Sequence, residues 1–313
     1  MILAIILFLV ACALLLNELY KHTNAYQNQF VDVRRFAIKG EVNDNLEIVN
    51  LGSNHPKFGF DYDGLDFKGE NWAIGPEAFE YDFIILKKYV SHLASGAVVV
   101  IPVCLLSFFL YRFDNSNTYM KYYRFLEKKE FPHYTLMGKM KSYLPLLFNP
   151  KLIRYVIKDT KTSKVSIIEY NPIDTDKELN KDANNWKKGW EKQFGISLNK
   201  LILSNKNKND IQKNIQILKE MIEFCLSKGL KPVIAILPVT NYLYSRFTPE
   251  FIENHILAYI AEANEAKVPV KNYLTDERFT DSSLYINSFF FNTKGRKKFT
   301  KQFIEDLRAQ SIL

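Results

Sequence analysis

The chain has 313 residues, of which 47% are hydrophobic, 14% aromatic and 24% charged, and its formal net charge is +8. This composition excludes a disordered chain, a collagen-like repeat and a protein with many membrane spans, and the length suffices for one large α/β domain or two small ones. Three cysteines, Cys12, Cys104 and Cys225, exclude a disulfide framework and a zinc site built from paired CxxC motifs. The positive charge is spread among Tyr, Phe and Asn residues, so it fits an anionic surface or substrate, and we expect no nucleic-acid partner.

The first apolar run, residues 1–16, contains no charged side chain and predicts a helix. At 1.5 Å per residue it reaches roughly 24 Å, and residues 17–20 extend it toward the ~30 Å hydrocarbon core of a membrane. We therefore expect a single-pass membrane anchor over residues 1–20, followed by a linker over residues 21–44. The alternatives are a buried core helix, a signal peptide lacking its usual basic start and cleavage site, and a lipoprotein signal ending at Cys12.

The charges beside this run bear on the side of the membrane that holds the rest of the chain. No basic residue precedes the run, and four follow it: Lys21, Arg34, Arg35 and Lys39. By the positive-inside rule, this distribution predicts a body in the cytoplasm.

A second apolar run, from Val90 to Tyr111, is long enough by hydropathy alone to cross a membrane. Its residues 97–101 are rich in β-branched side chains, and Pro102 interrupts its centre. We therefore predict a buried strand over residues 97–101 with apolar flanks that line a core, and a second membrane span is the alternative.

Strands and helices alternate along most of the remaining chain. We predict strands over residues 46–51, 231–239 and 268–274, and helices within residues 71–92, from Asp210 to Gly229, after Thr248, and over residues 293–307. This alternation implies an α/β fold with a mostly parallel sheet flanked by helices, in one domain over residues 45–313. Ligands of such sheets bind at the carboxyl ends of the strands.

Residues 114–200 differ from this pattern because they are rich in Lys, Asn and Tyr and show weak periodicity. We interpret them as an insertion or lid built on the sheet, without a core of its own. The mixture of aromatic and basic residues fits a polyanion or a glycan. A solvated face over a small hydrophobic cluster is the alternative.

Three segments at the predicted strand ends and before the last helix carry a family resemblance. They are Asn50–Asp61, Leu237–Tyr242 and Asp281–Gly295. In this order they resemble the SGNH (GDSL-like) hydrolase superfamily over roughly residues 45–310, and most of all its membrane-anchored branch in cell-envelope polysaccharide modification, which includes the D-alanyl teichoic acid transfer proteins. The resemblance implies a three-layer, flavodoxin-like sandwich, a body outside the cytoplasm and no cofactor or metal. That location conflicts with the one predicted from the flanking charges.

The residues expected to carry catalysis depart from the family pattern. In the family, a Gly-x-Ser turn supplies the nucleophile, and a terminal Asp-x-x-His supplies the orienting carboxylate and the general base. The corresponding positions here hold Asn54, Asn287 and Phe290. An amide cannot attack an ester and a phenyl ring cannot accept a proton, so the resemblance implies a degenerate site. Asn71 and Asn241 match the oxyanion-hole or binding positions, with ordinary loop capping as the alternative.

Ser53 and His55 offer a second route to catalysis. Residues i and i+2 of an extended segment share a face, so these two side chains could pair, with Asp61 or Asp281 as the orienting carboxylate. Turn capping and packing are the alternative roles for both side chains.

Three functional hypotheses follow. The preferred one is a membrane-anchored, catalytically degenerate protein that binds or scaffolds components of envelope polysaccharide acylation, with an envelope polysaccharide or a membrane-bound acyltransferase as its partner. The second is an active O-acyl esterase or acyltransferase that uses Ser53. The third is an interaction module in which residues 114–200 dock a membrane protein.

Overall fold

The computed structural model describes residues 1–38, 40–158, 173, 175–200 and 202–313. The chain folds into two compact units: one joins Met1–Val42 with Phe113–Glu169, and the other joins Asn43–Arg112 with Tyr170–Leu313. The segment expected as a linker and the first part of the expected insertion therefore belong to one unit. The last part of the insertion belongs to the unit that contains the sheet.

The second unit is built on a parallel sheet. In the described part of the chain its five strands are β1 (Leu46–Asn50), β2 (Gly69–Asn71), β3 (Leu93–Pro102), β4 (Lys231–Ile236) and β5 (Val270–Asn272). They lie in the order β2-β1-β3-β4-β5, and every neighbouring pair is parallel, which confirms the predicted α/β class. The strand order reverses between β1 and β3, and the crevice outside the carboxyl ends at such a point is where doubly wound sheets bind ligands.

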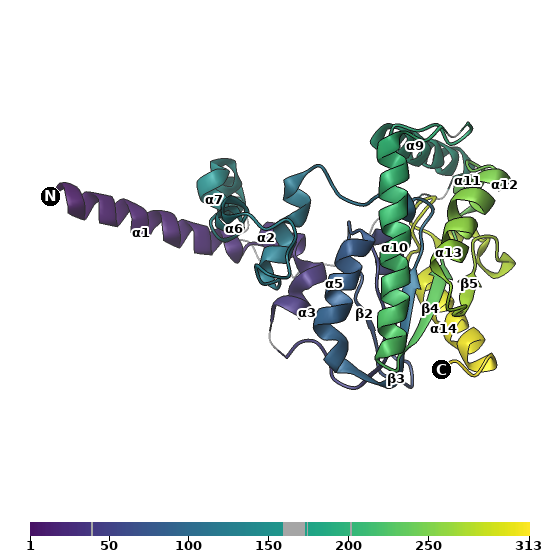
Figure 1. Ribbon diagram of the computed structural model, residues 1–313. Helices are drawn as coiled ribbons and strands as arrows, with labels where there is room; N and C mark the ends of the chain where they lie inside the picture. The colour runs from purple at the N-terminus through teal and green to yellow at the C-terminus, as the bar shows by residue number, and fades with distance from the viewer. Residues whose placement is uncertain (39, 159–172, 174, 201) are drawn as a thin grey trace. The chain divides into compact units, whose positions relative to one another are not determined.

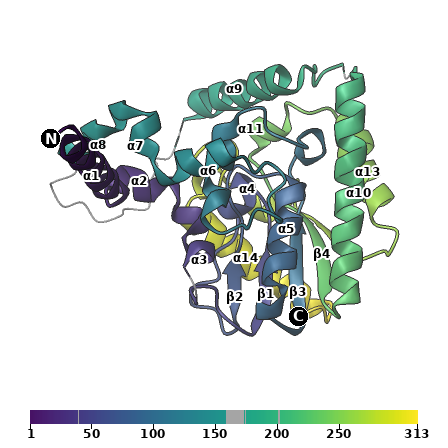
Figure 2. The ribbon, with the colours of Figure 1, turned by 60° about the vertical axis from the view of Figure 1, so that its left-hand side comes forward.

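Helices cover both faces of this sheet. Figure 2 shows α5 and α10 in front of the strands and α14 behind them. The helical elements of this unit are α4 (Asn54–Lys57), α5 (Phe79–Tyr89), η2 (Val90–His92), η3 (Ser107–Phe109), α9 (Asp176–Phe194), α10 (Asn205–Ser227), α11 (Asn241–Tyr244), α12 (Pro249–Ile252), the π-turn η6 (Glu253–Leu257), α13 (Ala258–Ala263), η7 (Glu277–Phe279), η8 (Ser282–Leu284) and α14 (Thr293–Ala309).

The central strand β3 shows why the second apolar run resembles a membrane span. Its Val98 and Val100 belong to the core cluster that packs against Phe299 and Phe303 of α14, while Val99 is equally buried on the opposite face. A parallel strand covered on both faces is apolar at every position rather than at alternate positions. The predicted buried strand is confirmed, and the run is not a transmembrane helix.

Helix α9 was not predicted as an element of its own. Thr175 caps its first turn by accepting a hydrogen bond from the Glu178 amide, and Gly195 ends it in the left-handed conformation at φ 62°. Its buried side is narrow, with only Leu179 and Ala183 fully buried, and the rest of its surface is polar. A narrow apolar stripe gives a weak periodic signal, which explains why this helix was missed.

The boundaries of two other predicted elements also differ. The stretch expected to be helical from residue 71 holds the end of strand β2 at Asn71, and helix α5 begins only at Phe79. Helix α10 begins at Asn205 rather than Asp210 because a capping box forms between Ser204 and Asn207.

In its described residues, the regular structure of the first unit is helical. Its elements are α1 (Ile2–Lys21), α2 (Asn24–Gln29), η1 (Val31–Val33), α3 (Arg34–Ala37), η4 (Ser116–Arg124), α6 (Leu136–Tyr143), α7 (Pro145–Phe148), η5 (Pro150–Leu152) and α8 (Ile153–Lys158). Among the described residues, α1 (Figure 1) is the one helix long and apolar enough to cross a membrane, with a mean hydropathy of 2.7 and only 6% of its apolar stretch buried.

Candidate functional site

The carboxyl ends of β1, β2 and β4 bring the predicted site residues to one end of the sheet. The turn after β1 contains Ser53, Asn54 and His55, and β2 ends at Asn71. His55 Nε2 lies 3.1 Å from the carbonyl oxygen of Pro238, which follows β4. The loop before α14 joins this group, because the ring centroids of His55 and Phe289 are 4.4 Å apart.

Gly52 determines how the chain turns out of β1. Its φ is +111°, a conformation that L side chains rarely adopt, and a Cβ there would collide with the ring of Pro56. Its amide donates a 2.6 Å hydrogen bond to Oδ1 of the buried Asp82. This turn directs the chain straight into α4, so residues 53 and 55 do not form the extended segment that the predicted pair needs.

Ser53 and His55 have separate partners. The Ser53 hydroxyl accepts a 2.9 Å hydrogen bond from the backbone amide of Glu77. Because a carbonyl oxygen can only accept, the imidazole of His55 must donate from Nε2 to Pro238. In the described structure no hydrogen bond joins Ser53 to His55.

His55 is held in its neutral form by burial. Its side chain is 4% exposed, and Nδ1, the acceptor nitrogen in this tautomer, has no hydrogen-bond partner among the described residues. Removal from water disfavours the imidazolium and lowers the pKa of His55 from its usual 6.5 to about 4, against a smaller opposing effect of the Pro238 carbonyl. An imidazole with this pKa is a weak general base at neutral pH.

Asn71 is engaged on both sides of its amide. Its Nδ2 donates to the carbonyl oxygens of Pro56, Lys57 and Phe60 at 3.0–3.2 Å, and its Oδ1 accepts from the Asn50 side chain at 2.8 Å and from the Ala73 amide at 3.1 Å. These bonds close the chain around α4. The side-chain amide of Asn71 is therefore bonded to backbone carbonyls and is not available to donate to a substrate oxyanion.

Asn241 lies in a different setting. It is the exposed first residue of α11. The Thr240 hydroxyl caps this helix by accepting a hydrogen bond from the Leu243 amide. The two asparagines predicted as oxyanion or binding groups therefore lie in different environments. Asn71 is hydrogen-bonded to backbone carbonyls, and Asn241 is exposed at the surface.

The three positions that replace the family triad have structural contacts. Asn54 packs its side-chain oxygen against Gly75, where no Cβ would fit. Asn287 accepts hydrogen bonds from the amides of Phe289 at 2.9 Å and Phe290 at 2.8 Å, which forms a local turn. The Phe290 ring then packs with its centroid 6.4 Å from that of His55.

An aromatic cluster, defined as Phe58, Trp186, Trp190, Phe289 and Phe290, lies beside His55, which contacts its members Phe289 and Phe290. The Trp186 ring centroid lies 5.2 Å from Phe289 and 5.5 Å from Phe290, and both contacts are edge-to-face. Phe58 contacts Phe290 at 5.1 Å, and Trp190 contacts Phe289 at 5.4 Å. The two tryptophans come from α9, so this unpredicted helix supplies rings that pack against Phe289 and Phe290, the two rings that contact His55.

A buried hydroxyl and a carboxylate meet beside this cluster. The Ser288 side chain is 0% exposed, and both its hydroxyl and its amide donate to Oδ2 of Asp182 on α9, the amide at 3.0 Å. The Ser288 carbonyl accepts a 2.7 Å hydrogen bond from the Thr240 hydroxyl. Sequence reasoning did not select this pair. The available signal was the spacing of Leu179, Asp182 and Trp186 on one side of a helix with the Thr-x-x-Glu capping pattern.

The two carboxylates considered as orienting groups lie elsewhere. Asp61 is 7% exposed and forms a 3.1 Å ion pair with Nε of Arg296 on α14. Asp281 accepts hydrogen bonds from the amide and hydroxyl of Ser283, which lower the pKa of this carboxyl. Neither carboxylate therefore orients His55. Among the described residues, no group of three or more His, Cys, Asp or Glu side chains is arranged to hold a metal ion.

Comparison with known proteins gives structural matches only. No protein-family model matches the sequence, and no curated protein matches it. A solved structure from Streptococcus pneumonia, provisionally described as a platelet activating factor, aligns with 95% of this chain and 98% of its own at 13% identity and a TM-score of 0.40. A provisionally described acylhydrolase from Bacteroides fragilis aligns over 92% of this chain and 96% of its own at 12% identity and a TM-score of 0.36. The fold assignment rests on the strand order and register given above.

Proposed function

We propose that this protein is a membrane-anchored, catalytically degenerate SGNH-hydrolase-like protein that serves as a binding or scaffold component in the acyl modification of cell-envelope polysaccharide. The observation that carries the proposal is the state of His55. Its imidazole is neutral, buried against the rings of Phe289 and Phe290, and hydrogen-bonded to a backbone carbonyl instead of a hydroxyl.

Acyl transfer through a serine needs a hydroxyl whose proton passes to a nearby base. Here the Ser53 oxygen accepts a hydrogen bond from an amide, and the imidazole beside it has another partner. Loss of one member of such a triad reduces the rate by roughly 10³–10⁶. The geometry therefore supports binding rather than turnover at this end of the sheet.

The aromatic cluster and the charge of the chain support the proposed class of ligand. Trp186 and Phe290 are only half-buried, so parts of their ring faces remain accessible at the carboxyl end of the sheet. A net charge of +8 favours an anionic polymer by long-range attraction. An envelope polysaccharide, or the membrane-bound acyltransferase that modifies it, is the proposed partner.

The decisive test for the degenerate site is labelling with a fluorophosphonate probe, which reacts with an activated serine and ignores a silent one. The full chain in detergent is compared with Ser53→Ala and with Ser288→Ala, beside an active serine esterase as the positive control. We expect no labelling and no hydrolysis of acetyl esters. Labelling that disappears in either variant would overturn the proposal, and loss in Ser53→Ala would establish the O-acyl esterase or acyltransferase alternative.

Two further measurements address ligand and location. Titration of the full chain with purified anionic envelope polysaccharide, with and without its acyl groups, is expected to show binding that Trp186→Ala weakens. A body outside the cytoplasm is proposed from the family resemblance, against the prediction of the positive-inside rule. A reporter fused to the C-terminus, active on one side of the membrane only, decides between the two locations.

A further inference from the structure

The first unit contains a second apolar surface besides α1. We use the name collar for residues 136–158, which contain α6, α7, η5 and α8. Leu136 is 69% exposed and Leu147 is 63% exposed, far more than core leucines. The other large apolar side chains exposed in the collar are Met137, Met140, Tyr143, Phe148, Ile153 and Ile157. Eight large apolar side chains exposed within residues 136–158 indicate an interaction site rather than an ordinary solvated face.

The charge of the collar has a single sign. Residues 131–158 contain no Asp or Glu. All five basic side chains of the collar are exposed: Lys139, Lys141, Lys151, Arg154 and Lys158. Short helices that combine exposed apolar side chains with Lys and Arg, without acidic residues, are typical of segments that lie in the surface of an anionic membrane.

The collar is attached to α1 at one defined level. Asn17 is 2% exposed, its Nδ2 donates to the Tyr143 carbonyl at 2.9 Å, and its Oδ1 accepts from the Leu146 amide at 3.3 Å. Asn17 is the first polar residue after the apolar run of α1. Figure 1 shows α6 and α7 beside the second half of α1, in agreement with the contacts between α1 and both α7 and α8. The collar therefore sits where α1 would leave the hydrocarbon core.

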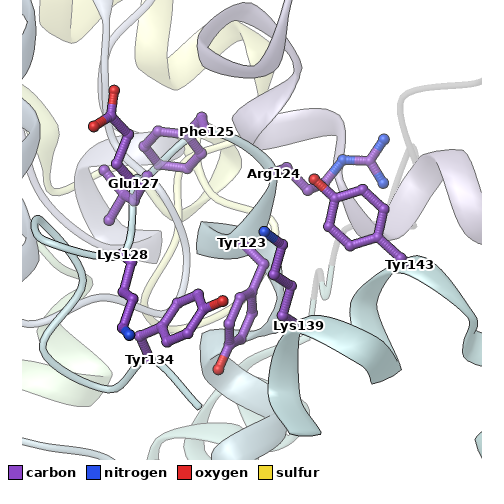
Figure 3. Close-up of a pocket in the computed structure, with 9 residues that line it drawn as sticks. Tyr123, Arg124, Phe125, Glu127, Lys128, Tyr134, Lys139 and Tyr143 are labelled. Carbon is purple, nitrogen blue, oxygen red and sulfur yellow. The ribbon is translucent and has the colours of Figure 1, made fainter. Parts of the chain in front are cut away.

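A pocket in the same unit has cations at its edge. It is a cavity of about 340 Å³ lined by residues 123–128 together with Tyr134, Lys139 and Tyr143. Figure 3 shows Lys128 near Tyr134 and Lys139 beside the pocket, and each ammonium group lies within about 6 Å of a tyrosine ring, at 5.8 Å for Lys128–Tyr134 and 6.0 Å for Lys139–Tyr143. Tyrosine and lysine together suit the polar headgroup layer of a bilayer.

We propose that the collar lies in the headgroup layer of an anionic lipid bilayer, as a second membrane contact beside the span α1. The apolar side chains of α6–α8 enter the boundary with the acyl chains, and the basic side chains contact lipid phosphates. Two contacts fix the orientation of the first unit on the membrane, which a single helix cannot do. This inference takes α1 as the span and does not depend on whether the sheet domain is catalytic.

The experiment measures the depth of single fluorescent labels in the full chain reconstituted into vesicles. Cys12→Ser removes the cysteine of α1. Of the other two, Cys225 is buried and Cys104 is half-buried, and burial raises the pKa of the Cys104 thiol to about 12, which makes it a poor target for a thiol-reactive label. Labels are then placed at Leu147→Cys and Leu136→Cys in the collar. Leu9→Cys marks the span, and Leu226→Cys, an exposed leucine of α10, is the matched control.

Quenching by brominated lipid and by aqueous iodide is compared for each label in vesicles containing phosphatidylglycerol. We expect the collar labels to be quenched by the brominated lipid and protected from iodide, as at Leu9, and the Leu226 label to show the reverse. Collar labels that respond like Leu226 while Leu9 is quenched by lipid would overturn the proposal, including the case in which a second copy or another protein covers this surface. Failure of Leu9 as well would place the error in the assignment of the span, and it would overturn the collar proposal with it.

The charge requirement is tested by a triple variant, Lys139→Gln, Lys151→Gln and Arg154→Gln. In this variant the lipid quenching of the Leu147 label should no longer increase when phosphatidylglycerol replaces neutral lipid. The matched control replaces exposed lysines outside the collar, Lys206→Gln, Lys208→Gln and Lys297→Gln, and should keep the increase. Equal behaviour of the two triple variants would contradict the role of anionic lipid. Circular dichroism of both variants verifies that they are folded.

Discussion

Replacement of the buried imidazole should remove much of the acid sensitivity of the sheet domain. The variant His55→Gln retains an amide that can donate to the Pro238 carbonyl, and it cannot titrate in this range. The prediction therefore isolates the protonation of one side chain from the loss of its hydrogen bond.

The magnitude follows from the difference between the two pKa values. Above pH 6.5 the imidazole is neutral in both the folded and the unfolded chain. Below that pH the unfolded chain binds a proton, whereas the folded chain does so only near pH 4, so the free energy of unfolding falls as the pH falls through this window. At about 1.4 kcal/mol per pKa unit, the loss is about 2 kcal/mol between pH 7 and pH 5 and about 3 kcal/mol in total.

Urea unfolding followed by tryptophan emission provides the assay. The three tryptophans, Trp72, Trp186 and Trp190, all belong to the unit with the sheet, and the last two pack in the aromatic cluster beside His55. The signal therefore reports on this unit alone. Unfolding free energies are measured at several pH values between 7 and 4 for the native chain and for His55→Gln.

We expect the stability of His55→Gln to fall less steeply with acid than that of the native chain, by the amounts given above. His92→Gln, in the same unit, is the control and should keep the full acid loss caused by His55. If the native chain and His55→Gln lose stability in parallel, the imidazole is not buried in its neutral form, and the main support for a degenerate site disappears.

Three substitutions test the contacts that build the turn and the aromatic cluster, each measured by the urea midpoint of unfolding. Gly52→Ala forces a Cβ against Pro56 at a positive φ and should cost at least about 2 kcal/mol. Asn71→Ala leaves backbone carbonyls without their donor and should cost about 2–4 kcal/mol, so an unchanged midpoint would contradict the bonding described for this amide. Trp186→Ala removes a half-buried ring packed against Phe290 and should cost roughly 2–3 kcal/mol, and a cost near zero would show that the cluster is not packed.

The fold class could be predicted because its signals are local. The strand at residues 97–101 was predicted from its β-branched residues, and the helix predicted over residues 293–307 corresponds to α14, which Asn292 caps. Helix α9 was not predicted because its buried stripe is narrow and its sequence is dominated by Lys and Asn. The short strand β2 was not predicted because a segment of three residues is too short for its periodicity to distinguish a strand from the start of a helix.

The candidate site could be predicted only in part. The residues after β1 were identified as a group, and the structure places them at the carboxyl end of the sheet as parallel-strand topology requires. Their individual partners were not predictable, because His55 bonds to Pro238 across 183 residues and Ser288 bonds to Asp182 across 106 residues. Periodicity and capping describe neighbours along the chain, whereas these contacts depend on how distant segments pack.

The sequence by itself determined that strands and helices alternate, that the first helix is apolar enough for a membrane, and that Asn54, Asn287 and Phe290 cannot carry out serine-type acyl transfer. Only the tertiary structure showed that His55 is buried and neutral, that the side-chain amide of Asn71 donates its hydrogen bonds to backbone carbonyls, and that an exposed basic collar contacts α1 at Asn17. The physical reason is that residue type fixes what a side chain can do, while burial and hydrogen-bond partners fix what it does, and both of these arise from packing between segments far apart in the chain.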